Sequence, residues 1–153
     1  MKFQDKLIAL GGKMASQKHL RAISRGLMAI MPLTILGSVF QLISAVPDIF
    51  PFIPAYSDAV KNAILFPYNM AFGLFGVIAT LTITYFFAEN EKVDIIQSEV
   101  IALISFMIMA APINSETNSF DATYLGSAGI FLAIIVSLLT VTMWKLKKCI
   151  TLL

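Results

Sequence analysis

Charge, cysteine and histidine are all scarce in this chain of 153 residues. Only 13% of its residues are charged, whereas a typical soluble domain has about 25%. Cys149 is the single cysteine and cannot form an internal disulfide, and His19 is the single histidine. No cluster of three nitrogen, sulfur or carboxylate ligands is recognisable, although catalytic metal sites usually need one. The sequence therefore predicts no metal site and no bound cofactor.

Other motifs of catalysis and binding are missing as well. The sequence has no Walker-type glycine loop, no serine–histidine–acid set and no carboxylate pair poised in a cleft. Its net charge of +2 does not indicate nucleic-acid binding, because the cations cluster beside apolar segments instead of forming a basic face. These absences argue against a self-sufficient catalyst, and the thin supply of polar side chains argues against a complete sugar pocket.

What the chain has instead is long apolar runs, since 58% of its residues are hydrophobic. Residues 26–46 contain no charged side chain, and as a helix they would rise about 31 Å, which matches a hydrocarbon core of about 30 Å. This run predicts a membrane span. Pro32 lies inside it and predicts a bend near Ile30 to Leu33.

Similar runs predict an all-α integral membrane protein. We expect four transmembrane helices at about 26–46, 68–88, 95–113 and 125–144. Residues 47–67 hold four prolines and are expected to form a loop at the membrane interface. Within this loop, Ser57 is predicted to cap a short helix that ends near Phe66.

The third of these spans has the weakest signal. Its uncharged part, residues 100–113, would rise only about 21 Å, and extending the helix back to Ile95 brings in Glu99. The segment either crosses the membrane with Glu99 near the headgroups or forms a tilted or re-entrant segment. Ionisable groups near a membrane interior are functional by default, but a position at a helix end weakens that interpretation.

Small residues recur at helical spacing in two of the predicted spans. In lipid, small side chains let helix backbones approach closely, so these positions predict helix packing. The predicted packing residues are Gly73 and Gly76 in the second span and Gly129, Ala133 and Ser137 in the fourth.

Basic residues flank the spans and predict the orientation of the chain. With both termini and the turn at residues 89–99 on the cytoplasmic side, ten of the eleven lysines and arginines lie inside, and Lys61 alone lies outside. If the third span did not cross, the split would fall to seven against four. The expected topology anchors are Lys18, Arg21, Arg25, Trp144, Lys145, Lys147 and Lys148.

The two ends of the chain differ from its apolar middle. Residues 1–25 form a basic amphipathic segment whose first 17 residues suit a helix lying on the membrane surface, or else a frayed tail. His19 is either a proton relay or a polar residue at headgroup level, and Arg21 and Arg25 either set topology or bind anionic lipid. Residues 26–144 form the transmembrane part, and residues 145–153 form a basic tail.

Several loose motifs occur in an order that resembles a known family. The resemblance covers residues 1 to about 144 and is to the lactose/cellobiose-type permease component, IIC, of the bacterial sugar phosphotransferase system. The motifs are His19-Leu20-x-Ala22-Ile23-x-x-Gly26, Met31-Pro32-Leu33-Thr34-Ile35-x-Gly37-Ser38-Val39-Phe40, Ala71-Phe72-Gly73, Tyr85-Phe86-Phe87-Ala88 and Ser105-Phe106-x-x-x-Ala110-x-Pro112.

The resemblance implies a role in sugar uptake across the bacterial plasma membrane. Members of the family carry a β-linked disaccharide that a cytoplasmic IIB partner phosphorylates. Their N-terminal half forms a homodimer interface and their C-terminal half holds the sugar pocket. This chain would correspond to most of the N-terminal half, so we expect a truncated piece that lacks the sugar-binding half and cannot transport alone; the tail after Trp144 no longer resembles the family.

A second reading of the sequence belongs to a different class. The complete, orientation-consistent set of spans also suits a small stand-alone membrane adaptor or regulator. Such a protein would oligomerise through the stripe of Gly129, Ala133 and Ser137.

Overall fold

A computed structural model describes residues 17–50, 52, 54–111, 113–114, 119–120 and 124–151. The amphipathic surface helix predicted for residues 1–17 falls almost wholly outside this part of the chain. The described elements are helices, apart from two strands of two residues each that pair as an antiparallel ribbon, β1 (Ile113–Asn114) and β2 (Ser119–Phe120).

The first helix, α2 (Lys18–Ile49), is the longest, with 32 residues. It contains the predicted span 26–46 and extends beyond it at both ends. The helix continues through Pro32 and Pro47, so the proline at 47 does not start the loop that the sequence predicted. The bend expected near Pro32 stays a prediction.

The second predicted span is not one helix. The structure has α3 (Asp58–Gly73) and α4 (Phe75–Glu91), which meet at Leu74 with a bend of 43°. The expectation of a continuous helix over 68–88 is therefore wrong, and so is the end of the short helix at Phe66. Ser57 does occupy the N-cap position of α3, but its side chain makes no capping hydrogen bond.

A contact from a distant loop accompanies this break. The backbone N–H of Gly76, in the first turn of α4, donates to the carbonyl of Leu125 at 2.9 Å. The first N–H groups of a helix have no partner within the helix, so this bond satisfies one of them. This partner lies 49 positions away along the chain, so local sequence does not reveal the contact.

The remaining helices are α5 (Ile95–Ala110) and α6 (Ile130–Thr151), the latter preceded by the 3-10 turn η1 (Ser127–Gly129). Asp94 caps α5, because its carboxylate accepts a hydrogen bond from the N–H of Gln97 at 2.9 Å. With 16 residues, α5 rises about 24 Å, less than the hydrocarbon core.

Two helical segments, Lys18–Ile49 and Ser127–Lys147, are long and apolar enough to cross a membrane. The bent pair of α3 and α4 adds a third if it counts as one span.

Three helices pack around α4, namely α5, α6 and the N-terminal half of α2. We call these four elements the core. Its central buried side chains are Ile30, Ile83, Phe106, Ala133 and Val136.

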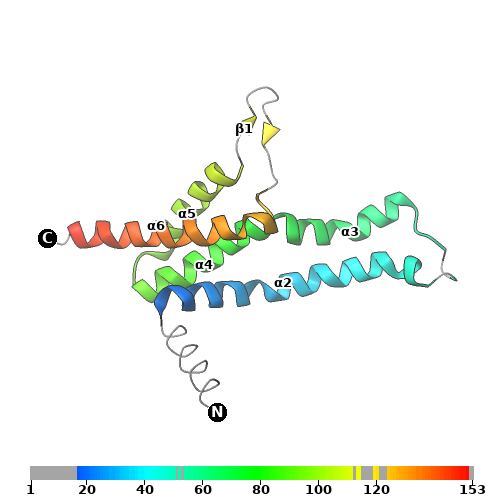
Figure 1. The fold of residues 1–153 in the computed structure, drawn as a ribbon, viewed down its shortest axis with the longest axis horizontal. Helices are drawn as coiled ribbons and strands as arrows, with labels where there is room; N and C mark the ends of the chain where they lie inside the picture. Colours follow the sequence, from blue (N-terminus) through cyan, green and yellow to red (C-terminus); the bar gives the residue numbers. More distant parts are fainter. Residues whose placement is uncertain are drawn as a thin grey trace, which may run out of the picture.

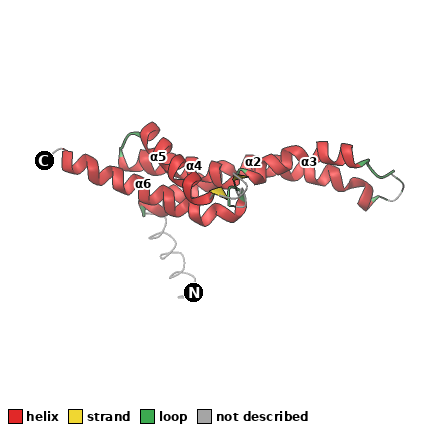
Figure 2. Cartoon of the chain, turned by 90° about the horizontal axis from the view of Figure 1, so that it is seen from above, coloured by secondary structure: helices red, strands yellow, loops and turns green. Residues whose placement is uncertain are grey.

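The rest of α2 runs beside α3 and projects away from the other helices (Figures 1 and 2). We call this two-helix extension, which comprises α2 from Gly37 onward together with α3, the arm. Its helices meet where Gly37 faces Phe72 and Ala71.

Candidate functional site

Three charged side chains meet at the end of the core opposite the arm. The carboxylate of Glu91, the last residue of α4, accepts from the ammonium of Lys145 on α6 at 2.6 Å and from that of Lys18 on α2 at 3.2 Å. The Glu91 side chain is only 6% exposed, whereas both lysines are more than half exposed. We call this trio the clasp, because it ties three helix ends together.

The clasp shifts the protonation of its carboxyl group. The hydrogen bond from Lys145 is the main reason that the pKa of Glu91 lies below its usual value, and Lys18 acts in the same direction. Burial works against this shift, but the two lysines outweigh it. Glu91 is therefore ionised at neutral pH.

The sequence prediction identified two members of the clasp but not their partner. Lys18 and Lys145 were expected as topology anchors, and the structure places both of them on Glu91. The only available signal was that Glu91 lies in a short polar turn between apolar runs, a position that many unpaired surface residues share. The clasp brings the start of α2, the end of α4 and the last turns of α6 to the same end of the molecule.

The other predicted anchors lie at this same end. Arg21 is exposed and Arg25 half-buried on the first turns of α2. The Lys147 ammonium lies 4.8 Å from the centre of the Trp144 ring, a cation–π contact on α6. Lys148 belongs to α6, but its side chain lies outside the described side chains. His19 packs against Phe87 with ring centres 4.7 Å apart.

Four of the five predicted packing residues are buried where α4 meets η1 and α6. An added Cβ on Gly76 would lie 2.8 Å from the Leu125 carbonyl oxygen, and one on Gly129 would collide with the Tyr124 carbonyl. Ala133 and Ser137 are fully buried. The Ser137 hydroxyl lies 3.1 Å from the carbonyl of Thr80 on α4 and 2.7 Å from its own helix's Ala133 carbonyl.

This arrangement contradicts one part of the second sequence reading. The stripe of Gly129, Ala133 and Ser137 faces α4 of the same chain, so it is already covered. The expectation that this stripe carries oligomerisation is therefore wrong.

Gly73 differs from the other packing residues, because it is exposed and an added Cβ would meet nothing within 4 Å. Two glycines that the sequence analysis did not select do pack closely. An added Cβ on Gly26 would lie 2.8 Å from the Ile83 Cα on α4, and one on Gly37 would lie 3.0 Å from the Phe72 ring. Their signal was the spacing of small residues along α2, where the buried positions are Ala22, Gly26, Ile30, Gly37 and Ser44.

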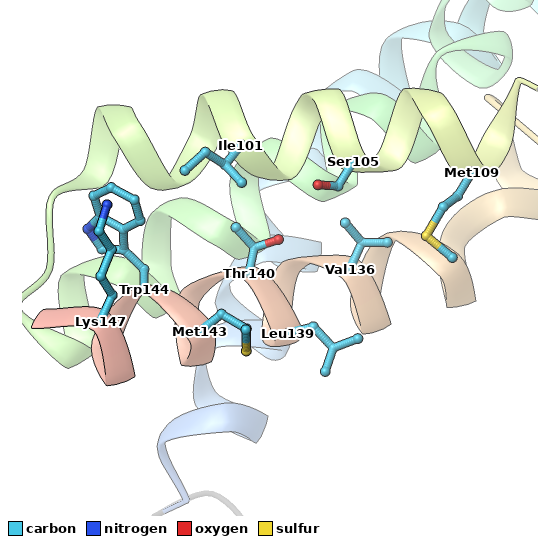
Figure 3. A pocket seen from close by; sticks show the side chains of 9 residues that line it. All are labelled: Ile101, Ser105, Met109, Val136, Leu139, Thr140, Met143, Trp144 and Lys147. Atoms are coloured by element: carbon cyan, nitrogen blue, oxygen red, sulfur yellow. The ribbon is translucent and has the colours of Figure 1, made fainter. Parts of the chain in front are cut away.

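An open, largely apolar groove lies between α5 and α6 (Figure 3). Its volume is about 440 Å³, and Trp144 and Lys147 lie at one end. Glu99, the ionisable residue that the sequence placed near the membrane, is half-buried in the second turn of α5 and does not line this groove. Among the described residues, no three histidine, cysteine, aspartate or glutamate side chains gather as a metal site would require.

Comparison with known proteins relates this geometry to a family. The family model described as "Phosphotransferase system, EIIC" matches residues 24–151, which include every helix of the structure except the first turns of α2. The chain belongs to the EIIC family. This confirms the resemblance seen in the sequence, and EIIC components are integral proteins of the bacterial plasma membrane.

Individual EIIC relatives match most of this chain. The cellobiose-specific EIIC component of Geobacillus stearothermophilus is 26% identical over 161 residues, covering 93% of this chain and 35% of the relative. The lichenan permease IIC component of Bacillus subtilis is 27% identical over 163 residues, covering 94% and 35%. The lactose-specific EIICB component of Streptococcus mutans is 28% identical over 142 residues, covering 88% and 24%.

A solved structure shares the fold. The crystal structure of the transporter ChbC, the IIC component from the N,N'-diacetylchitobiose-specific phosphotransferase system, superposes with a TM-score of 0.73 at 26% identity. The match covers 93% of this chain and 36% of ChbC. The chain thus spans about a quarter to a third of the length of the relatives that it matches.

Proposed function

We propose that these residues form the N-terminal, assembly-forming part of a IIC permease component that takes up a cellobiose- or lactose-type disaccharide. The observation that carries the proposal is the family match over residues 24–151 together with the superposition on ChbC. In this proposal residues 26–144 are the membrane-embedded scaffold, residues 1–25 and 145–153 are basic flanking segments, and the sugar pocket belongs to a C-terminal part that these residues lack.

The described side chains support a scaffold better than a complete transporter. The buried polar groups of the core are few and mostly internal, since Thr80, Ser98 and Ser137 each donate to a carbonyl of their own helix or its cap. Sugar sites need several convergent polar groups that are free to reach the ligand. We therefore propose that the 153 residues alone do not transport sugar.

The clasp supports the predicted orientation. It groups the start of α2, the end of α4 and the last turns of α6, which are the basic ends that the positive-inside rule assigns to the cytoplasm. We propose four crossings with both termini cytoplasmic, in which the bent pair of α3 and α4 is the second crossing and α5 the short third one. A IIB component would then approach from the clasp side; the lactose-specific relatives are named EIICB, which joins the two components in one name.

We also propose that the chain forms a homodimer through the arm. The arm consists of two helices and exposes large apolar side chains on both of them, including Val39, Leu42 and Phe66. Such a face needs lipid or protein to cover it. A second, stand-alone role as an adaptor remains the alternative function, although the stripe once expected to support it is buried.

A chimera tests the function directly. Residues 24–151 would replace the matching third of the Geobacillus stearothermophilus cellobiose-specific EIIC component, in cells that lack their own EIIC. We expect cellobiose uptake driven by phosphoenolpyruvate with the chimera and none with the 153 residues alone. The proposal fails if the chimera reaches the membrane at normal levels without uptake, or if the short chain transports by itself.

A further inference from the structure

The groove between α5 and α6 has the size, length and polarity of a site for one lipid chain. Its floor includes the buried Val136, and Ile101 and Met109 line it from α5 (Figure 3). Its volume of about 440 Å³ lies within the usual range for small-molecule sites, about 300–1,000 Å³. No other described helix covers it, so lipid or further protein must fill the groove in a membrane.

The length of the groove distinguishes between these occupants. Along α5 it runs from Ile101 to Met109, about 12 Å of helix, and along α6 from Val136 to Lys147, about 16 Å. One leaflet of a hydrocarbon core about 30 Å thick is about 15 Å deep. The groove therefore matches a single acyl chain of one leaflet, whereas a transmembrane helix from a partner would require a seam of twice that length.

The polarity of the groove changes from one end to the other, as it does across one leaflet of a membrane. Its deep end is apolar, with Val136 and Met109, and its other end carries Trp144 and Lys147. An indole and a lysine are the pair that anchors helices at the headgroup level. The Lys147 ammonium lies over the Trp144 ring, so its charge is held at the mouth of the groove.

We propose that this groove binds an anionic phospholipid, with one acyl chain between α5 and α6 and its phosphate beside Lys147. The bound lipid would belong to the leaflet on the clasp side. It would fill the seam between two helices whose packing on each other is looser than that of either helix on α4. The proposal depends on membrane insertion but not on sugar transport, so the two can fail separately.

The single tryptophan of the chain reports on this site, because Trp144 lines the groove. The purified 153-residue chain would be placed in phosphatidylcholine vesicles that contain one brominated lipid, either brominated phosphatidylglycerol or brominated phosphatidylcholine. Brominated acyl chains quench indole fluorescence on contact. We expect the brominated phosphatidylglycerol to give half-maximal quenching at a mole fraction about fivefold lower, equivalent to about 1 kcal/mol for one lysine near the surface.

Two pairs of variants separate the groove from general lipid contact. Ser105→Phe fills the groove, and its control Ile104→Phe places the same ring on the neighbouring exposed face of α5. Lys147→Gln removes the charge at the mouth, and its control Lys61→Gln removes one near the other end of the molecule. We expect the preference for phosphatidylglycerol to disappear in Ser105→Phe and Lys147→Gln and to remain in both controls.

Other results overturn the proposal. Equal quenching by the two lipids in the unmodified chain would mean that the groove does not select an anionic lipid. A preference that survives both Ser105→Phe and Lys147→Gln would place it elsewhere on the surface. If neither brominated lipid quenched Trp144, a second copy or another protein segment would cover the groove. Lys147→Gln lies on an exposed side chain, so this test holds even if Ser105→Phe fails to fold.

Discussion

The core and the arm are built from equally apolar helices, yet they pack in different ways. In the core, α4 is surrounded by three helices, and its contacts are made by Gly26, Gly76, Ala133 and Ser137, where backbones approach closely. In the arm, Gly37 of α2 faces the aromatic ring of Phe72 on α3, and large apolar side chains face outward.

The ion pairs of the two regions differ in the same way. The clasp joins three helices through a carboxylate that is 6% exposed. The arm has the pair of Lys61 and Asp48 at 3.5 Å, in which the two side chains are 44% and 69% exposed. Exposed pairs contribute about 0–1 kcal/mol, whereas removing one partner of a buried pair costs several times more. The comparison teaches that the core is held by its own chain, while the arm is left for lipid or a second protein to cover.

Three glycine substitutions give the largest expected contrast between the regions. Gly26→Ala places a Cβ 2.8 Å from the backbone of α4, and we expect a loss of about 1–3 kcal/mol of stability. Gly37→Ala meets the Phe72 ring at 3.0 Å and the Ala71 Cβ at 3.2 Å, which are wider gaps than at Gly26, so its loss should be less than about 1 kcal/mol. Gly73→Ala meets open space and should stabilise by up to about 1 kcal/mol through helix propensity.

Thermal unfolding in detergent, followed by circular dichroism, would rank these three variants. The order Gly26→Ala, Gly37→Ala, Gly73→Ala from least to most stable is the expected result. A Gly37→Ala variant as unstable as Gly26→Ala would remove the distinction between core and arm.

Loss of the clasp should be the next largest effect. In Glu91→Gln the two lysines lose their ionised partner, and we expect a loss of about 1.5–2 kcal/mol, the lower part of the range for hydrogen bonds to charged groups, because both lysines are more than half exposed. Asp48→Asn in the arm is the matched control, with an expected change below about 0.5 kcal/mol. Equal melting temperatures for the two variants would show that the clasp does not hold the helix ends together.

Acid should remove the stabilisation that the clasp gives to the unmodified chain, whereas Glu91→Gln has no such stabilisation to lose. Because the lysines lower the pKa of Glu91, the clasp stabilises the fold fully above the ordinary glutamate pKa of about 4.3 and loses this contribution as the pH falls through the lowered value. The difference in melting temperature between the unmodified chain and Glu91→Gln should therefore be constant near neutral pH and shrink below about pH 4. A difference that persists undiminished in strong acid would contradict the ionised pair.

The smallest expected effect concerns a single hydroxyl. Ser137→Ala removes a hydroxyl that lies 3.1 Å from the Thr80 carbonyl on α4 and 2.7 Å from the Ala133 carbonyl of its own helix, and we expect a loss of at most about 0.6 kcal/mol. Thr142→Ala is the control, since its hydroxyl bonds to the Leu138 carbonyl of its own helix on an exposed face. The prediction is that Ser137→Ala melts at a lower temperature than Thr142→Ala. Equal melting temperatures would mean that the contact between α6 and α4 at Ser137 contributes nothing to stability.

The sequence predicted the features that depend on local composition. The uncharged run at 26–46 lies within α2, and the run at 125–144 corresponds to η1 and α6 with a later start and a later end. Basic residues such as Lys18 and Lys145 were expected at one end of the helices, and the structure brings these two together there. Lipid as the solvent makes apolar length and flanking charge informative without knowledge of the partners.

Features that depend on distant contacts were not predicted. The break at Leu74 lies in a uniformly apolar run, and the Leu125 carbonyl that partners α4 after the break is far away in the sequence. In the sequence, Glu91 is an ordinary polar residue of a turn, and only the structure shows that two lysines from other helices bind it. The prediction that Gly129, Ala133 and Ser137 mediate oligomerisation failed for the same reason. Spacing shows which residues share a helix face but not which helix covers that face.

The most direct test of the account is the accessibility of its two ends. In a Cys149→Ser background, Glu89→Cys marks the clasp end and Ser57→Cys marks the far end of the arm; both side chains are exposed. A membrane-impermeant maleimide should label Ser57→Cys in intact cells and Glu89→Cys only after the membrane is opened. Labelling of both positions from outside, or of neither until the cells are opened, would contradict a chain that spans the bilayer with its clasp in the cytoplasm.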